Sequence, residues 1–238
     1  MDAARTGIGA SLAGLLLGAL VTSGALASSV DPPLPPPRPD RREAPPAEPS
    51  PPETKAAPPE AAENGGCPDR LARLGVRFEE RPPVHEDACS VEDAVLVSAL
   101  PDGVEVKPPS LMRCPVAEAL ARWTLETVAP EADRRLEAAV TAIAIGTSYQ
   151  CRNQRSGSKL SEHAFGNGVD VMGFEFAKRG PVHVVDPEGS PEGAFRIAIQ
   201  RGACPIFTTV LGPGSDEAHA NHLHLDLRAR RGGYRICQ

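Results

Sequence analysis

The chain has 238 residues and a formal net charge of −6 at pH 7. A net negative charge argues against nucleic acid and anionic membrane surfaces as partners. Its 26 prolines and six cysteines are unevenly distributed, so the chain divides into segments of different character.

Residues 1–27 have the features of a secretory signal. Arg5 supplies a positive charge, residues 6–21 are apolar and uncharged, and residues 25–27 read Ala-Leu-Ala, a small-x-small cleavage site. The apolar run is shorter than the ~20 residues that a membrane-spanning helix needs. We therefore expect a cleaved signal with no stable membrane span after its removal, and a retained anchor is the alternative.

Residues 28–66 contain 13 of the 26 prolines and no aromatic residue. Such a segment cannot bury enough apolar surface to offset the entropy cost of ordering it, so we expect a disordered linker rich in extended polyproline conformation. Two interpretations stay open. The segment is either a spacer that meets an envelope protein partner or a tail without such a role.

Residues 67–238 are long enough for one domain with a sizeable core. An even number of cysteines behind a signal segment indicates an oxidising compartment and up to three disulfides. The spacing leaves the pairing open, with a weak preference for Cys204–Cys237, which would tie the chain end to the core. The cysteines, all in this domain, are Cys67, Cys89, Cys114, Cys151, Cys204 and Cys237.

Apolar periodicity and turn residues predict the secondary structure of the domain. Because the helices come early and the strands cluster in the second half of the domain, we expect an α+β fold, a mainly antiparallel sheet with flanking helices. A short helix should lead into a strand within residues 71–80, and residues 94–100 and 103–108 should form a hairpin. We expect further helices at residues 114–130, 130–140 and 191–203, and further strands at 141–149, 168–176, 182–185, 205–211 and 222–227.

The stretch His-Leu-His-Leu-Asp-Leu at residues 222–227 alternates polar and apolar side chains. In a strand, His222, His224 and Asp226 would share one face, and the leucines would face the core. Polar side chains fixed on a rigid strand suit a metal site. Taken alone, the stretch equally fits a half-exposed strand with a polar face.

A second polar stretch, Ser-Glu-His-Ala-Phe-Gly-Asn-Gly-Val-Asp, occupies residues 161–170. Asp170 interrupts an apolar strand, and a buried carboxylate needs a cation or firm hydrogen bonds. Zinc takes imidazole and carboxylate ligands, and a catalytic site uses three of them. Together, His163, Asp170 and His224 would supply a site for one Zn²⁺ ion.

Both stretches resemble motifs of known zinc peptidases. Residues 161–170 are similar to the S-x-H-x-x-G-x-A-x-D motif of the lysostaphin, D-alanyl-D-alanine carboxypeptidase and hedgehog group, and residues 222–224 resemble its H-x-H motif. The His-x-x-His-x-His spacing from His219 is similar to that of penicillin-insensitive murein endopeptidases. Over most of residues 67–238 the chain resembles the bacterial extensin-like C-terminal domain family. The resemblance implies the zinc-peptidase core of that group as the fold.

The resemblance also implies a role for each matching position. His163, Asp170 and His224 match metal ligands, and His222 matches the histidine that handles the water or the transition state. The remaining matches are His219, a further active-site histidine; Ser161, a partner that orients a ligand; and Arg152, which with Tyr149 marks a substrate-binding region.

The sequence departs from these motifs at two positions. Gly168 replaces the usual alanine, which should loosen the turn. Asn221 stands where the carboxypeptidases place a glutamate general base, so an endopeptidase pattern with a histidine base fits better. Asp226 either accepts a proton from a ligand imidazole or is structural. His85 and His183 lie outside both motifs, and Glu162 should face solvent.

These observations lead to one hypothesis and two alternatives. We expect a secreted zinc metallopeptidase of the bacterial periplasm that hydrolyses peptidoglycan stem peptides or cross-links, with His222 and His219 as catalytic residues. One alternative is a cell-wall-binding or structural protein whose zinc site is structural or vestigial. The other is a D,D-carboxypeptidase, whose only product would be free D-alanine.

Overall fold

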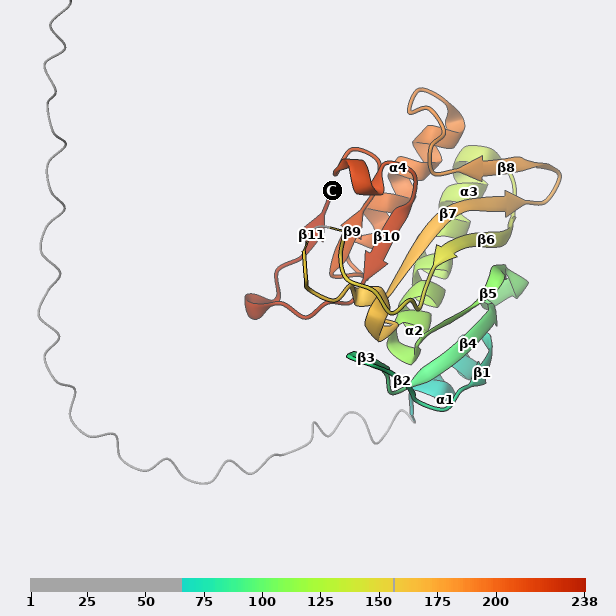
Figure 1. Cartoon of the computed structure of the whole chain (residues 1–238). Coiled ribbons are helices and arrows are strands. Elements are labelled where there is room, and N and C mark those ends of the chain that lie inside the picture. Colours follow the sequence, from blue (N-terminus) through green and yellow to red (C-terminus); the bar gives the residue numbers. More distant parts are fainter. Residues whose placement is uncertain (1–65, 156) are drawn as a thin grey trace, which may run out of the picture. The chain divides into compact units, whose positions relative to one another are not determined.

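The computed structural model describes residues 66–155 and 157–238. They form a mostly antiparallel sheet, with α2, α3 and α4 packed together against one face (Figure 1), so the expected α+β class is confirmed. The expected signal segment and residues 28–65 of the expected linker lie outside the described residues. Within the described part, no helix is both long and apolar enough to cross a membrane.

The main sheet has nine strands in the order β1-β4-β5-β6-β7-β10-β9-β11, and β8 pairs with β7. Only β5 with β6 and β9 with β11 are parallel among the pairs in this part of the chain. A separate hairpin joins β2 to β3. The strands are β1 (Arg77–Glu80), β2 (Val84–Glu86), β3 (Cys89–Val91), β4 (Ala94–Ala99), β5 (Glu105–Arg113), β6 (Val140–Thr147), β7 (Gly168–Phe176), β8 (Arg179–His183), β9 (Thr209–Leu211), β10 (Leu223–Asp226) and β11 (Ile236–Cys237).

The helices expected at residues 114–130 and 130–140 form one continuous run. A π-helical turn over residues 124–128 joins them, and Thr124 Oγ1 donates a hydrogen bond to the carbonyl of Leu120 at 2.8 Å. The turn lies just before Pro130, whose missing N–H and bulky ring disturb an ordinary α-helix. The α-helices are α1 (Cys67–Arg73), α2 (Cys114–Trp123), α3 (Ala129–Leu136) and α4 (Pro191–Ala203).

The core lies between this helical layer and the sheet. Trp123 is fully buried, its indole N–H donates to the carbonyl of Ile199 at 3.0 Å, and Phe174 and Phe207 pack around its ring. Leu223 and Leu225 of β10 are fully buried in the same core. The predicted alternation in β10 is therefore confirmed, and its polar side chains lie on the sheet face away from the helices.

Several strand boundaries differ from the prediction. β7 and α4 match their predicted ranges, but β9 begins only at Thr209, because the chain before it turns directly out of α4 and Phe207 N–H donates to the carbonyl of Ala203. β8 covers residues 179–183 rather than 182–185. β10 excludes His222 and Leu227. β2, β3 and β11 have two or three residues each and were not predicted.

All six cysteines form disulfides, and the preferred Cys204–Cys237 pairing is confirmed. It ties the end of α4 to β11. Cys67–Cys114 joins the starts of α1 and α2, and Cys89–Cys151 joins β3 to the segment after β6. Three disulfides favour an oxidising compartment outside the cytoplasm.

Gly166 offers a test of how the turn before β7 is held. Its φ of +58° is left-handed, and a Cβ there would approach Val91 to 3.0 Å and the backbone nitrogen of Arg113 to 3.2 Å. We expect Gly166→Ala to lower the free energy of unfolding by about 1–3 kcal/mol. The matched control is Gly180→Ala, where an added Cβ meets nothing within 4 Å. Urea titration would measure both, and equal stabilities of the two variants would contradict this role of Gly166.

Candidate metal site

Three predicted ligands come together because of one strand register and one short turn. β10 pairs with β7 so that His224 lies directly opposite Asp170. His163 belongs to the 3-10 turn η4 (Glu162–Phe165), which immediately precedes β7. Ser161 caps this turn, since its hydroxyl accepts a hydrogen bond from the backbone N–H of His163 at 3.4 Å. The turn, the cap and the register place all three side chains at one point of the open sheet face.

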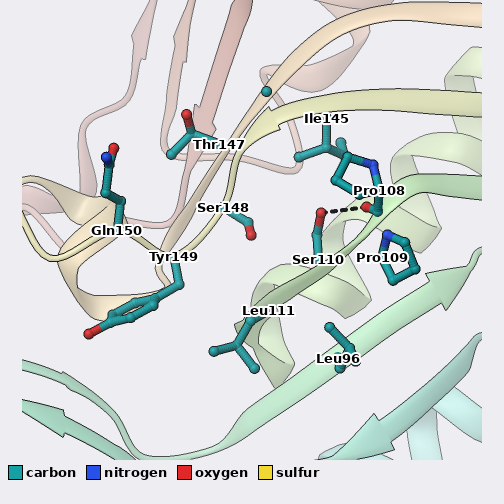
Figure 2. Close-up of a pocket in the computed structure, with 11 residues that line it drawn as sticks. Leu96, Pro108, Pro109, Ser110, Leu111, Ile145, Thr147, Ser148, Tyr149 and Gln150 are labelled. Carbon is teal, nitrogen blue, oxygen red and sulfur yellow. Dashed lines mark hydrogen bonds between the residues drawn. The ribbon is translucent and has the colours of Figure 1, made fainter.

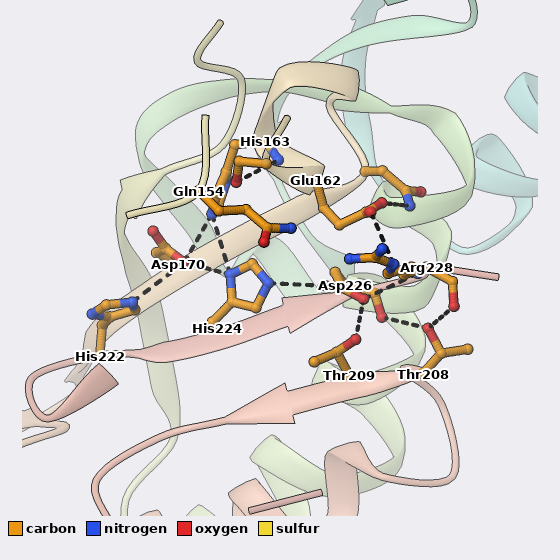
Figure 3. Close-up of polar contacts among 12 residues, drawn as sticks. Gln154, Glu162, His163, Asp170, Thr208, Thr209, His222, His224, Asp226 and Arg228 are labelled. Atoms are coloured by element: carbon orange, nitrogen blue, oxygen red, sulfur yellow. Dashed lines mark hydrogen bonds and ion pairs between the residues drawn. The ribbon is translucent and has the colours of Figure 1, made fainter. Parts of the chain in front are cut away.

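The three side chains meet through single atoms (Figure 3). His163 Nε2 lies 3.1 Å from Asp170 Oδ1 and 3.2 Å from His224 Nδ1, and the latter two atoms are 2.9 Å apart. All three residues are buried. The three atoms are close enough to one another to bind a single metal ion together.

Outer hydrogen bonds fix the tautomers of the two imidazoles. His163 Nδ1 lies 2.8 Å from the carbonyl oxygen of Ser148, which can only accept, so Nδ1 carries the proton and Nε2 has a free lone pair. His224 Nε2 likewise donates to Asp226 Oδ2 at 3.0 Å, which leaves Nδ1 to face the cluster. Two imidazole lone pairs and one carboxylate oxygen therefore point at each other. Such a set fits a bound cation, and without a metal a proton must take its place.

The pKa values describe the metal-free cluster. Burial alone would lower the pKa of His224, but its hydrogen bonds to Asp170 and Asp226 outweigh burial and raise the pKa to about 9. Burial would raise the pKa of Asp170, but the hydrogen bonds with His163 and His224 hold it well below the usual range. At pH 7 His224 is thus an imidazolium held between two carboxylates.

A second layer of contacts holds Asp226. Its Oδ1 accepts hydrogen bonds from the hydroxyl of Thr209 and, at 3.0 Å, from the backbone N–H of Arg228. Arg230 in turn donates to Thr209 Oγ1 at 2.7 Å. Asp226 therefore fixes the orientation of the His224 ring, an arrangement that carboxylates also adopt behind metal-binding histidines.

At Gly168, where the motif has alanine, the structure leaves little room for a side chain. It lies at the start of β7, and a Cβ there would come within 3.2 Å of His224 Cε1 and 3.3 Å of Asp226 Cβ. The missing side chain gives room to the buried imidazole. The expectation that Gly168 loosens a turn is wrong, because the residue is buried within a strand.

His222 and His219 stand beside the cluster. His222 Nε2 lies 3.6 Å from Asp170 Oδ1, and its Nδ1 lies 2.9 Å from Asn221 Oδ1. Burial lowers the pKa of His222, so its ring is neutral at pH 7. His219 is held by Asp216, whose Oδ1 lies 2.7 Å from its Nδ1, and its ring centroid is 5.3 Å from that of His222.

These residues line one open cavity of about 740 Å³, which we call the metal cleft. Its floor contains Asp170, His222 and His224. Arg152 and Arg155, from the segment after β6, line the same cleft, and Arg155 donates to the carbonyl of Ala218 at 3.3 Å. The cleft also includes Arg228 and Arg230, so arginines border the metal-facing acceptors.

Other predicted residues lie elsewhere or have ordinary partners. Tyr149 does not line the metal cleft, and its hydroxyl lies 2.9 Å from Glu86 Oε2. Glu162 does line it but, contrary to the expectation that it faces solvent, is largely buried and accepts from Asn167 Nδ2 at 2.6 Å. His85 and His183 are exposed and outside the cleft, as predicted.

Sequence reasoning missed Thr209, Asp216, Arg155 and Arg230. Asp216 has a local signal, because it caps the short turn η5 (Glu217–His219) three residues before His219. Thr209 reaches the site only through the pairing of β9 with β10. No local pattern marks that pairing.

The chain was also compared with known proteins. The family described as extensin-like protein C-terminus matches residues 65–238, which include every residue of the metal cleft. No curated protein and no solved structure matches the chain. The likeness of the fold to the zinc-peptidase core therefore stays a prediction.

The raised pKa of His224 makes metal binding depend on pH. A metal ion must displace the proton on Nδ1, so we expect uptake at pH 7 to release about one proton, with apparent affinity rising about tenfold per pH unit up to about pH 9. Titration calorimetry with zinc in buffers of different ionisation enthalpy measures the proton count. Affinity that does not change between pH 6.5 and 8.5 would contradict the assignment of Nδ1 as a ligand.

Proposed function

Because the chain belongs to the extensin-like C-terminal family and carries a buried His-Asp-His cluster, we propose that it is a zinc-dependent peptidase acting on peptidoglycan stem peptides or cross-links. The observation that carries the proposal is the convergence of three acceptor atoms with fixed tautomers beside an open cleft. The resemblance of both motifs to those of murein endopeptidases supports the substrate class. The disulfides support an extracytoplasmic location, which we place in the bacterial periplasm.

The ligand set suits one zinc ion. Two imidazole nitrogens and one carboxylate oxygen form a three-ligand set, which leaves a further position for water or substrate. His163 and Asp170 would bind through Nε2 and Oδ1, and His224 through Nδ1. A zinc ion held by these residues would polarise a peptide carbonyl and lower the pKa of a bound water. A closed structural site would instead use four protein ligands.

His222 is the proposed general base. With Nδ1–H donated to Asn221, its Nε2 has a free lone pair that faces Asp170 across 3.6 Å. A neutral imidazole at this point can accept the proton of the attacking water and later protonate the leaving amine. Asn221, which replaces a carboxypeptidase glutamate, thus holds the base in its working tautomer.

His219 and the arginines would act on the substrate side. Asp216 Oδ1 accepts a hydrogen bond from His219 Nδ1. The other ring nitrogen of His219, Nε2, therefore points away from Asp216. Arg152 donates from Nε to Gln150 Oε1 at 2.9 Å and from Nη1 to the carbonyl of Asn153 at 3.3 Å. A guanidinium at the edge of the cleft suits a stem-peptide carboxylate.

The decisive test of the function is digestion of purified peptidoglycan by the zinc-loaded protein. We expect soluble fragments with newly freed amino groups, and no release when a chelator has removed the metal. Binding without released fragments, with and without chelator, would instead support a wall-binding or structural protein. Release of free D-alanine alone would identify a D,D-carboxypeptidase.

Two histidine variants separate metal binding from proton transfer. His224→Ala should lose both bound zinc and cleavage while the protein stays folded. His222→Ala should keep stoichiometric zinc, but its kcat should fall by a factor of about 10²–10⁴, because general base catalysis contributes a rate enhancement of that size. His183→Ala, at an exposed residue outside the cleft, is the control. Stoichiometric zinc in His224→Ala, or full activity in His222→Ala, would contradict the assigned roles.

A further inference from the structure

The main sheet opens between β5 and β6. The two strands pair only from Glu105 to Lys107 with Ala142 to Ala144. Beyond this point β5 continues against β4, and β6 continues against β7. Pro108 and Pro109 lack the N–H groups that would extend the ladder. Within the described residues, the edge of β6 that faces β5 therefore has no strand partner from Ile145 to Thr147.

A groove of about 420 Å³ fills this opening (Figure 2), and we call it the side groove. Residues 108–111 form one wall, residues 145–150 form the other, and Leu96 of β4 lines the groove from beyond β5. Successive side chains of a strand point to opposite faces, yet consecutive residues line both walls. The walls are therefore largely main-chain edges. Pro108 and Pro109 leave half of the β5 wall without N–H groups. Every residue of the β6 edge has one, and alternate N–H groups of a strand point to the edge away from β7.

The side groove is continuous with the metal cleft. Gly146, Thr147 and Gln150 line both cavities. The next residue after Thr147 is Ser148, whose carbonyl orients His163. Thr147 itself lies opposite Asp170 in the β6–β7 pairing. A chain that follows the β6 edge thus arrives directly at the candidate metal ligands.

The two cavities differ in charge. No charged side chain lines the side groove, whose surface is made of prolines, aliphatic side chains, hydroxyls and one amide. The metal cleft is lined by charged side chains of both signs, and its arginines include Arg152 and Arg155 from the segment after β6. A bound chain should therefore place an uncharged segment in the side groove and an anionic group in the cleft.

We infer that the side groove binds an extended, uncharged peptide arm of the substrate, which pairs as an added strand with the β6 edge at Ile145–Thr147. This inference rests on the proposed peptidase function and deepens it. Strand addition supplies main-chain hydrogen bonds, while shallow pockets select the side chains. The substrate then extends on both sides of the scissile bond, as a cross-link does and a terminal dipeptide does not.

The experiment measures binding without cleavage. The full chain is depleted of metal with chelator, mixed with a purified cross-linked muropeptide dimer, and followed by amide hydrogen exchange. We expect exchange to slow at least tenfold at those N–H groups of residues 145–147 that point away from β7, because the added strand would accept hydrogen bonds from them. Unchanged exchange at residues 145–147 in the presence of saturating dimer, or no binding of the dimer, would overturn the inference.

A pair of variants provides an independent readout. Pro109→Trp places a large side chain at an exposed position in the groove, and Thr141→Trp places it at an exposed position of β6 outside both cavities. We expect Pro109→Trp to weaken binding of the dimer at least tenfold and Thr141→Trp to leave it unchanged. Equal affinities would count against the side groove.

The two proposals fail in different ways. Zinc-loaded protein that releases no fragments while the dimer still protects residues 145–147 would leave the side groove standing and refute the peptidase. Cleavage of the dimer without protection of residues 145–147 would support the peptidase and refute peptide binding in the side groove.

Discussion

Three buried acceptor atoms that face one another are the constraint on which the candidate site depends. His163 Nε2, Asp170 Oδ1 and His224 Nδ1 lie within 3.2 Å of each other, and outer partners hold the protons of both imidazoles on the far side. Lone pairs in such an arrangement repel unless a cation lies among them, which is a proton on His224 Nδ1 in the metal-free protein and a metal ion when one is bound. The pairing of β7 with β10 keeps this arrangement rigid, since Leu223 and Leu225 anchor the opposite face of β10 in the core.

The surroundings of the cluster divide the open sheet face into zones with different chemistry. His222 lies beside the cluster as a neutral imidazole, and arginines border the cleft where a carboxylate would bind. The uncharged side groove leads away along β6. Cys89–Cys151 fixes the segment that follows β6 and carries Arg152 next to the cleft. Under the proposed function, position and charge together would orient a peptide substrate from the groove, past the cluster, to the arginines.

Local sequence signals were sufficient for much of this structure. The apolar run with one carboxylate predicted β7 at its observed range, and the alternation at residues 222–227 predicted which face of β10 is polar. The convergence of the three candidate ligands was also predicted, because two motifs together specified their positions. Features that depend on distant pairing were not predicted, such as β11 beside β9 and Thr209 beside Asp226. Tyr149 illustrates the same limit, since the motif that it shares with Arg152 did not predict that the two residues line different cavities.

The most direct test of the central claim is to locate the metal by anomalous diffraction at the zinc absorption edge from crystals grown with zinc. We expect one strong peak, about 2.0–2.2 Å from His163 Nε2, a carboxylate oxygen of Asp170 and His224 Nδ1, with no fourth protein ligand. A peak elsewhere, a ligand set that omits any of the three, or a fourth protein ligand that closes the site would contradict it.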